Sequence, residues 1–150
     1  MSQAYYELTR LIERLHRRYL DVLRAELNRQ GVKDVNPVQC LLLLNIGTEE
    51  VNVRNLMERG YYQGSNASYN IKKLVESGYL TQERAAHDRR STIIRVAEKG
   101  HELCAKIRAQ QDEQAESLCA RGSGERLEDA VKTLRDLERT WTDFIRYRAA

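Results

Sequence analysis

Apolar side chains recur every three or four positions along three long stretches of the chain, and this spacing predicts amphipathic helices. The first stretch covers residues 3–30 and stops at Gly31. The second covers residues 98–120, and the third covers residues 125–148 after a break at Arg121–Gly124. We therefore expect the chain to begin and end in long helices whose apolar stripes need a partner surface.

Residues 36–47 predict a shorter helix of a different character. Asn36 is a favourable N-cap, and Pro37 fits the first helical position. The run Cys40–Leu44 is apolar without interruption, and Gly47 marks the end of the helix. Because this helix is apolar on nearly all sides, we expect it at the centre of the core.

Two further helices are expected in the middle of the chain. Val51–Val53 is a short strand candidate, and Asn52 can cap a short helix that ends before a turn at residues 60–64. A longer helix over residues 65–77 ends at Gly78 in a left-handed cap. The inward face of this longer helix is expected to be Ala67, Ile71, Leu74 and Val75.

Two strand-like runs, residues 79–84 and 91–96, flank a polar tip at residues 85–90 and predict a β-hairpin. This order of elements is typical of a helix-turn-helix followed by a wing. We therefore expect a mainly α fold with a small β-wing, in which residues 36–97 form a winged helix-turn-helix lobe. Residues 3–31 and 98–148 form the remaining helical region.

The composition narrows the class of protein. The chain has 150 residues, of which 41% are hydrophobic and 31% are charged. These values exclude a disordered chain and indicate one domain with helical extensions. The longest apolar run has five residues, whereas a membrane-spanning helix needs roughly 20. No signal peptide is visible, so we expect a cytoplasmic protein, associated with the nucleoid if it binds DNA.

The net charge of +3 is small but unevenly distributed. Residues 51–100 contain nine Lys/Arg and five Asp/Glu, a net of +4, and the rest of the chain has a net of −1. A positive middle third favours a polyanion such as double-stranded DNA as partner. A solvated basic face without any partner explains the charge equally well.

The helix over residues 65–77 starts with small polar side chains, which allow a helix backbone to approach base edges in the major groove. Its lysines suit phosphate contacts, which set affinity and register. An ordinary polar helix surface is the alternative interpretation. The candidate DNA-binding residues are Ser65, Asn66, Ser68, Tyr69 and Asn70 for bases and Lys72 and Lys73 for phosphates.

The hairpin tip adds a second candidate element. Arg89 and Arg90 can enter a narrow minor groove. We expect Asp88 to shape the tip by pairing with Arg90, which leaves Arg89 as the freer contact, although the reverse order stays open. An exposed salt-bridged turn without a partner is the alternative.

Several segments of the chain resemble the MarR family of winged-helix transcriptional regulators across residues 51–103. These segments are Leu56–Arg59, Ser65–Ser68, Lys73–Leu80, Asp88–Arg90 and Glu98–Gly100. Ala97 departs from the family pattern, because many members have a capping Thr there. The turn at residues 60–64 contains two glycines and two tyrosines, and it resembles a subgroup found in alphaproteobacteria.

The resemblance implies a homodimer with intertwined terminal helices that reads a palindromic, inverted-repeat operator. It also implies repression of transcription and a small aromatic or phenolic effector. The expected dimerisation residues are Leu8, Leu11, Ile12, Leu15, Leu127, Leu134, Leu137, Trp141 and Phe144. The candidate effector-pocket residues are His16, Arg18, Tyr19 and Tyr62. Tyr19 also fits a core position, and His16 and Arg18 also fit the surface.

Three cysteines keep a thiol-redox switch open as an alternative. Cys40 lies in an apolar run and is expected to be inert. Cys104 and Cys119 lie about 22 Å apart along one helix at roughly 1.5 Å per residue, so they cannot bond within one chain. A bond between subunits stays open.

Other functional classes have less support from the sequence. His101 with Cys104 falls short of a zinc site. The chain has no phosphate-binding glycine loop and no nucleophile motif, so we expect no metal, no cofactor and no enzymatic activity. A winged-helix module used only for protein contacts is the remaining alternative.

Overall fold

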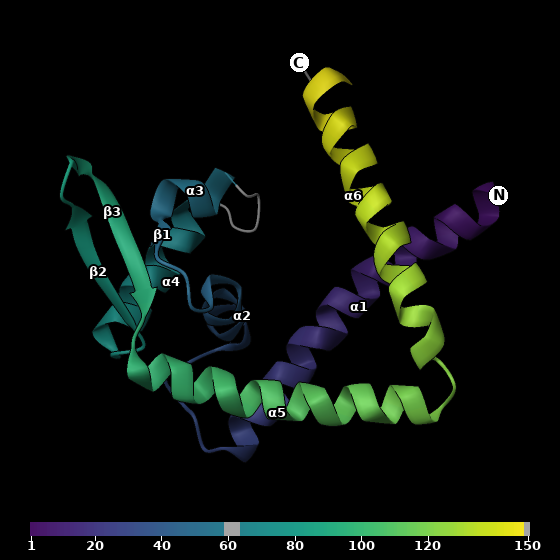
Figure 1. Cartoon of the computed structure of the whole chain (residues 1–150), viewed down its shortest axis with the longest axis horizontal. Helices are drawn as coiled ribbons and strands as arrows, with labels where there is room; N and C mark the ends of the chain where they lie inside the picture. Colours follow the sequence, from purple (N-terminus) through teal and green to yellow (C-terminus); the bar gives the residue numbers. More distant parts are fainter. Residues whose placement is uncertain (59–63, 149–150) are drawn as a thin grey trace. The chain divides into compact units, whose positions relative to one another are not determined.

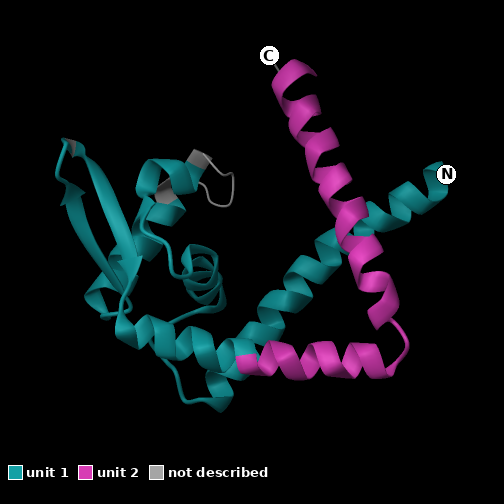
Figure 2. Ribbon diagram, viewed as in Figure 1, with its two compact units in different colours: residues 1–108 teal, residues 109–150 magenta. Residues whose placement is uncertain are grey.

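The structure, a computed structural model, describes residues 1–58 and 64–148, and its elements follow the predicted order (Figure 1). The elements are α1 (Ser2–Arg29), α2 (Pro37–Ile46), β1 (Val51–Asn52), α3 (Val53–Glu58), α4 (Gly64–Glu76), β2 (Leu80–Ala85), β3 (Asp88–Val96), α5 (Glu98–Ala120), the 3₁₀ turn η1 (Gly124–Arg126) and α6 (Leu127–Arg148). Residues 1–108 and 109–150 form two compact units (Figure 2). Within the described ranges no helix is long and apolar enough to cross a membrane.

Helix α2 lies at the centre of the first unit, as its apolar composition predicts. Its start is fixed by a capping box, in which the Gln39 N–H donates to Asn36 Oδ1 (2.8 Å) and the Asn36 N–H donates to Gln39 Oε1 (3.0 Å). Cys40, Leu42 and Leu43 are completely buried. The core around them includes Leu23 and Leu27 of α1, Ile71 and Leu74 of α4, Ile94 of β3, and Leu103 and Ile107 of α5. The end of α1 and the start of α5 therefore share one core with residues 36–97.

The predicted strands form one antiparallel sheet in the order β1-β3-β2. Val51 of β1 lies opposite Ile94 of β3, and Leu80 of β2 lies opposite Val96. The hairpin β2–β3 and the short strand are thus confirmed, and Ile94 contributes a buried side chain to the core. The sheet joins the start of α3 to the long hairpin.

The predicted hairpin tip at residues 85–90 is too long. β3 begins at Asp88, so only Ala86 and His87 remain between the strands. The pairing shifts from Arg84–Thr92 to Ala85–Asp88, which leaves residues 89–91 as an irregular segment of β3. A polar composition indicated a loop here, whereas the chain continues its strand pairing to Asp88.

The second unit contains the end of α5, η1 and α6 (Figure 2). The prediction placed the last helix at residues 125–148, but it begins at Leu127 because residues 124–126 form the 3₁₀ turn. Along α6 Leu137 is half-buried, and the other large apolar side chains are exposed in the single chain. They are Leu127, Val131, Leu134, Trp141, Phe144, Ile145 and Tyr147.

The start of α5 is packed closely against the end of β3 and the α4–β2 connection. The Ala97 N–H donates to the Tyr79 carbonyl oxygen (2.9 Å). A Cβ atom on Gly100 would lie 2.5 Å from that same oxygen and 2.6 Å from Val96 Cγ1. Lys99 Nζ donates to the carbonyl oxygen of Ser77 (2.9 Å). These contacts hold the start of α5 in place, although Ala97 has no hydroxyl group to cap the helix.

We predict that Gly100→Ala destabilises the protein, although alanine ordinarily stabilises a helix by about 1 kcal/mol relative to glycine. The added methyl group meets a backbone oxygen, and overpacking of this kind costs about 1–3 kcal/mol. Urea unfolding followed by circular dichroism should show a net loss of about 1 kcal/mol. Lys106→Ala, at an exposed position of the same helix, is the control. A Gly100→Ala variant more stable than the wild type would contradict the close packing.

Candidate nucleic-acid interface

Helix α4 separates an apolar inner face from a polar outer face. Ala67, Ile71 and Leu74 are at most 4% exposed, which confirms the predicted inner face. The described outer positions are Asn66, Ser68, Tyr69, Lys72 and Lys73, and all are exposed. The side chain of Ser65 lies outside the described part of the structure. The polar start of α4 is therefore accessible to a partner.

Asn70 does not belong to this outer face, so its prediction as a base contact is wrong. It is 8% exposed, and its Oδ1 accepts a hydrogen bond from Gln39 Nε2 of α2 (3.2 Å). A buried amide needs such a partner, because burying a polar group without one is unfavourable. Asn70 therefore ties α4 to α2.

The two lysines of α4 differ in their surroundings. Lys73 Nζ lies 3.7 Å from a carboxylate oxygen of Glu76 and 5.8 Å from the centroid of the Tyr69 ring. Lys72 is exposed and, among the described side chains, has no carboxylate partner within ion-pair distance. Lys72 is therefore the stronger phosphate candidate of the two.

Asp88 shapes the wing, but not through an ion pair with Arg90. Its Oδ1 accepts from the backbone N–H of Arg90 (2.9 Å), and its Oδ2 accepts from the Ser91 hydroxyl (3.1 Å). Among the described side chains the Arg90 guanidinium forms no ion pair with Asp88, and it is exposed. The Arg89 side chain lies outside the described part. Asp88 thus stabilises the irregular segment of β3 and leaves the charge of Arg90 available.

A pair of carboxylates holds the other arginine of β3. Arg95 Nη2 lies 2.7 Å from Glu50 Oε1 and 3.1 Å from Glu83 Oε1. The hydrogen bond that Arg95 donates to Glu50, followed by the charges of both acids, raises the pKa of Arg95. Arg95 therefore links β2 and β3 to the residue before β1 and is already neutralised.

The described members of the predicted effector set all lie on α1. His16 and Arg18 are exposed on α1, Tyr19 is half-buried against the core, and Tyr62 lies outside the described residues. A cleft of about 420 Å³ near the end of α1 is lined by other residues. They are Arg24, Leu27, Asn28, Val32, Lys33, Asp34, Val35, Asn36, Pro37 and Gln39.

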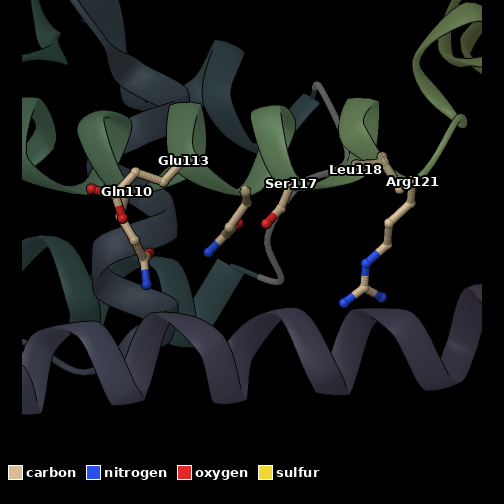
Figure 3. A pocket seen from close by; sticks show the side chains of 6 residues that line it. Gln110, Glu113, Ser117, Leu118 and Arg121 are labelled. Atoms are coloured by element: carbon tan, nitrogen blue, oxygen red, sulfur yellow. The ribbon is translucent and has the colours of Figure 1, made fainter.

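A cleft of about 420 Å³ in the second unit runs along one polar face of α5 (Figure 3). Its lining residues are Gln110, Glu113, Gln114, Ser117, Leu118 and Arg121. They include one carboxylate and one guanidinium, a mixture that favours neither an anionic nor a cationic ligand. We assign no ligand to this cleft.

The cysteines differ in their burial. Burial raises the pKa of the Cys40 thiol to about 12, with a smaller effect from the neighbouring Cys104. Burial also raises the pKa of Cys104, against the opposing charge of Arg108. Cys119 is exposed. The described thiols therefore include one that is accessible to oxidants.

Sequence reasoning missed Arg54. It was counted in the basic middle third, but no motif distinguished it. The structure places it on α3, where it lines the same cleft as Arg90. The sequence signal that could have indicated Arg54 is the Asn52 cap, because Asn52 Oδ1 accepts a hydrogen bond from the Arg54 N–H at the start of α3.

Comparisons with known proteins agree on the kind of protein this chain resembles. A family model described as a winged helix DNA-binding domain matches residues 35–100. Over 146 residues the chain is 43% identical to the exopolysaccharide II synthesis transcriptional activator ExpG of Rhizobium meliloti (strain 1021). This match covers 96% of the chain and 75% of the relative.

Solved structures share the fold at low sequence identity. A MarR transcriptional regulator from Methanosarcina mazei Go1 has a TM-score of 0.77 at 20% identity, with 91% of this chain and 97% of that chain covered. Streptococcus pneumoniae FabT in complex with DNA has a TM-score of 0.75 at 17% identity, with 93% and 98% covered. Staphylococcus aureus MarR in complex with salicylate and kanamycin has a TM-score of 0.76 at 17% identity, with 93% of each chain covered.

We predict that a single thiol, Cys119, reacts rapidly with a disulfide reagent in the folded protein at neutral pH. Cys40 and Cys104 should react only after unfolding, because burial keeps them protonated and inaccessible. The measurement is the number of thiols titrated before and after addition of denaturant, with Cys119→Ser as the control. A second rapidly reacting thiol would contradict the burial of Cys40 and Cys104.

Proposed function

The chain belongs to the MarR family of winged-helix transcriptional regulators, and we propose that it is a homodimer that binds an inverted-repeat operator through α4 and the wing. The family and the fold are those of regulators rather than enzymes. The observation that carries the proposal is the polar outer face of α4. Its small and amide side chains are exposed, whereas the opposite face is fixed in the core.

The proposed DNA contacts divide by role. Asn66 and Ser68 stand near the start of α4, where a recognition helix meets base edges, and Tyr69 stands beside them. An asparagine amide can bond an adenine edge in two places. Lys72 contacts a phosphate and so contributes to affinity rather than sequence preference. Arg89 and Arg90 extend the contact from the wing.

The homodimer is supported by the exposed apolar side chains of the single chain. On α6 these include Trp141 and Phe144, and on α1 they include Leu11 and Leu15. Burying such side chains contributes about 25 cal/mol per Å² of apolar surface, so an uncovered stripe favours association. A two-fold dimer presents two copies of α4, which fits half-sites about one helical turn apart.

Two observations point in opposite directions on whether the protein represses or activates transcription. The resemblance to the family implies repression, whereas the relative at 43% identity is named a transcriptional activator. We propose activation, because that relative matches nearly the whole chain. A reporter fused to the target promoter should lose expression when the gene for this protein is deleted. A gain of expression would support repression instead.

A small aromatic anion is the proposed effector class. The structure of Staphylococcus aureus MarR in complex with salicylate shares this fold and supports the proposal. A raised thermal midpoint with a phenolic acid, together with weaker DNA binding, is the expected result.

The thiol-redox alternative requires that peroxide produce a reducible dimer through Cys119 and change DNA binding. If peroxide leaves DNA binding unaltered, the redox alternative is wrong.

The experiment that tests DNA recognition is fluorescence anisotropy with DNA from upstream of the protein's own gene and with a scrambled duplex, at two salt concentrations. We expect one dimer per palindrome, tighter binding to the upstream DNA, and weaker binding at higher salt, because each neutralised phosphate releases counterions. Absence of DNA binding at low salt would support the protein-contact alternative.

We predict that Arg89→Ala combined with Arg90→Ala weakens operator binding by at least about tenfold, because charge-assisted hydrogen bonds contribute about 1.5–3 kcal/mol each. Both residues are on the projecting wing, so the dimer should remain folded. Anisotropy gives the affinity, and size-exclusion chromatography gives the oligomeric state. Unchanged operator affinity would show that the wing does not contact DNA.

We predict that Asn66→Ala alters sequence preference more than non-specific affinity. One lost bidentate pair removes about 1–3 kcal/mol of discrimination at a single base position. The measurement is competition among operator variants substituted at each base pair. Asn70→Ala is a contrasting variant, because its buried amide should affect stability instead. An equal loss on all sequences would make Asn66 a phosphate contact.

A further inference from the structure

We propose that Arg54 of α3 and Arg90 of β3 together hold one phosphate of the DNA backbone in the cleft between these two elements. This inference rests on the proposed DNA binding and adds a specific subsite to it. It assigns a role to Arg54, which lies outside both the recognition helix and the wing.

The cleft has a volume of about 470 Å³ and lies between the start of α3 and the irregular segment of β3. Helix α3 follows β1 directly and packs against β3 (Figure 1). The lining residues are Asn52, Val53, Arg54, Met57, Arg90, Ser91 and Thr92. Two guanidinium-bearing residues, one amide and two hydroxyls thus surround one space, with Val53 and Met57 as its apolar part.

Both arginines have a backbone fixed in the same way. The N–H of Arg54 donates to Asn52 Oδ1 (2.8 Å), and the N–H of Arg90 donates to Asp88 Oδ1 (2.9 Å). In each case the accepting side chain belongs to the residue two positions before the arginine. This hydrogen bond fixes the backbone of the arginine. The pairing of Asn52 with Ile93 holds β1, and with it the start of α3, against β3. The sheet therefore holds the segment that carries Arg54 beside the strand that carries Arg90.

The described residues that line the cleft carry positive charge only. Among the described side chains, neither guanidinium has a carboxylate partner within ion-pair distance, and no acidic residue lines the cleft. Arg95, on the same strand as Arg90, shows the opposite arrangement, because Glu50 and Glu83 both pair with it. Glu50 and Glu83 are thus bound to Arg95, and the Asp88 carboxylate is occupied by the Arg90 N–H and the Ser91 hydroxyl.

An oxyanion with several acceptor oxygens fits this arrangement. A guanidinium presents a planar fork of donors that matches a phosphate, and two forks from different elements can bind two of its oxygens. The hydroxyl of Thr92 and the amide of Asn52 add neutral donors. Because phosphate contacts carry no base information, this subsite fixes the position of the lobe on the duplex.

The test compares Arg54→Ala and Arg54→Lys with the wild type in binding a scrambled duplex over a range of salt concentrations. The phosphate is common to every sequence, so the operator need not be known. For Arg54→Ala we expect at least about tenfold weaker binding at low salt, and a salt slope lower by about 0.9 per subunit. Arg54→Lys keeps the charge without the fork and should recover part of the affinity.

Arg95→Ala is the matched control, because it removes the same charge from the same lobe. It also leaves the negative charges of Glu50 and Glu83 unpaired. Arg95→Ala should therefore weaken DNA binding through the general electrostatic field more than the removal of one cation alone would. A larger loss of affinity at Arg54 than at Arg95 is therefore local to the cleft. The thermal midpoint should be the same for Arg54→Ala and the wild type, because Arg54 is exposed.

A second measurement identifies the phosphate itself. Duplexes in which single phosphates are replaced by neutral methylphosphonates should bind the wild type more weakly at one position in each half-site. The loss at that position should be smaller for Arg54→Ala, in which only Arg90 remains to contact the phosphate. Equal losses for Arg54→Ala and Arg95→Ala, or a methylphosphonate profile unchanged by Arg54→Ala, would overturn the subsite. Failure of the wild type to bind any duplex would overturn the proposed function as well, so the two failures are distinguishable.

Discussion

Burial of most of the surface of α2 is the constraint on which the first unit depends. This helix has six buried residues among ten and leaves only Val38 and Asn45 exposed, so it needs neighbours around most of its circumference. Leu23 and Leu27 of α1, Leu74 of α4, and Ile107 of α5 provide them. Because these neighbours come from distant parts of the chain, one apolar helix brings the N-terminal helix, the recognition helix and the start of α5 into one core.

That packing leads directly to the candidate site. Ala67, Ile71 and Leu74 occupy the inner face of α4, so the polar start of the helix has to face outward. The Asn70–Gln39 hydrogen bond then fixes α4 against α2. On the other side of the lobe the sheet holds α3 beside β3, and Asp88 holds the irregular segment of the wing through backbone and hydroxyl groups. The proposed DNA contacts thus stand on elements that are held in place by these bonds and pairings.

The periodicity of Ala67, Ile71 and Leu74 was sufficient to predict the faces of α4, and the alternating runs were sufficient to predict the hairpin. Asn70 was misassigned because residue type does not reveal direction, and its partner Gln39 is 31 residues away in the sequence. The wing tip was predicted too long because its polar composition indicates a loop, whereas the strand pairing continues to Ala85 and Asp88. The cleft of Arg54 was invisible in the sequence, because it forms only when β1 pairs with β3.

The central claim is that two copies of one polar helix face, held by two identical cores, contact DNA at symmetric positions. Hydroxyl-radical footprinting of the upstream region tests it most directly. The account predicts two protected patches related by a dyad and spaced about one helical turn, or 10 base pairs, apart, with flanking protection from the wings. A single protected patch, or uniform protection without a dyad, would contradict the account.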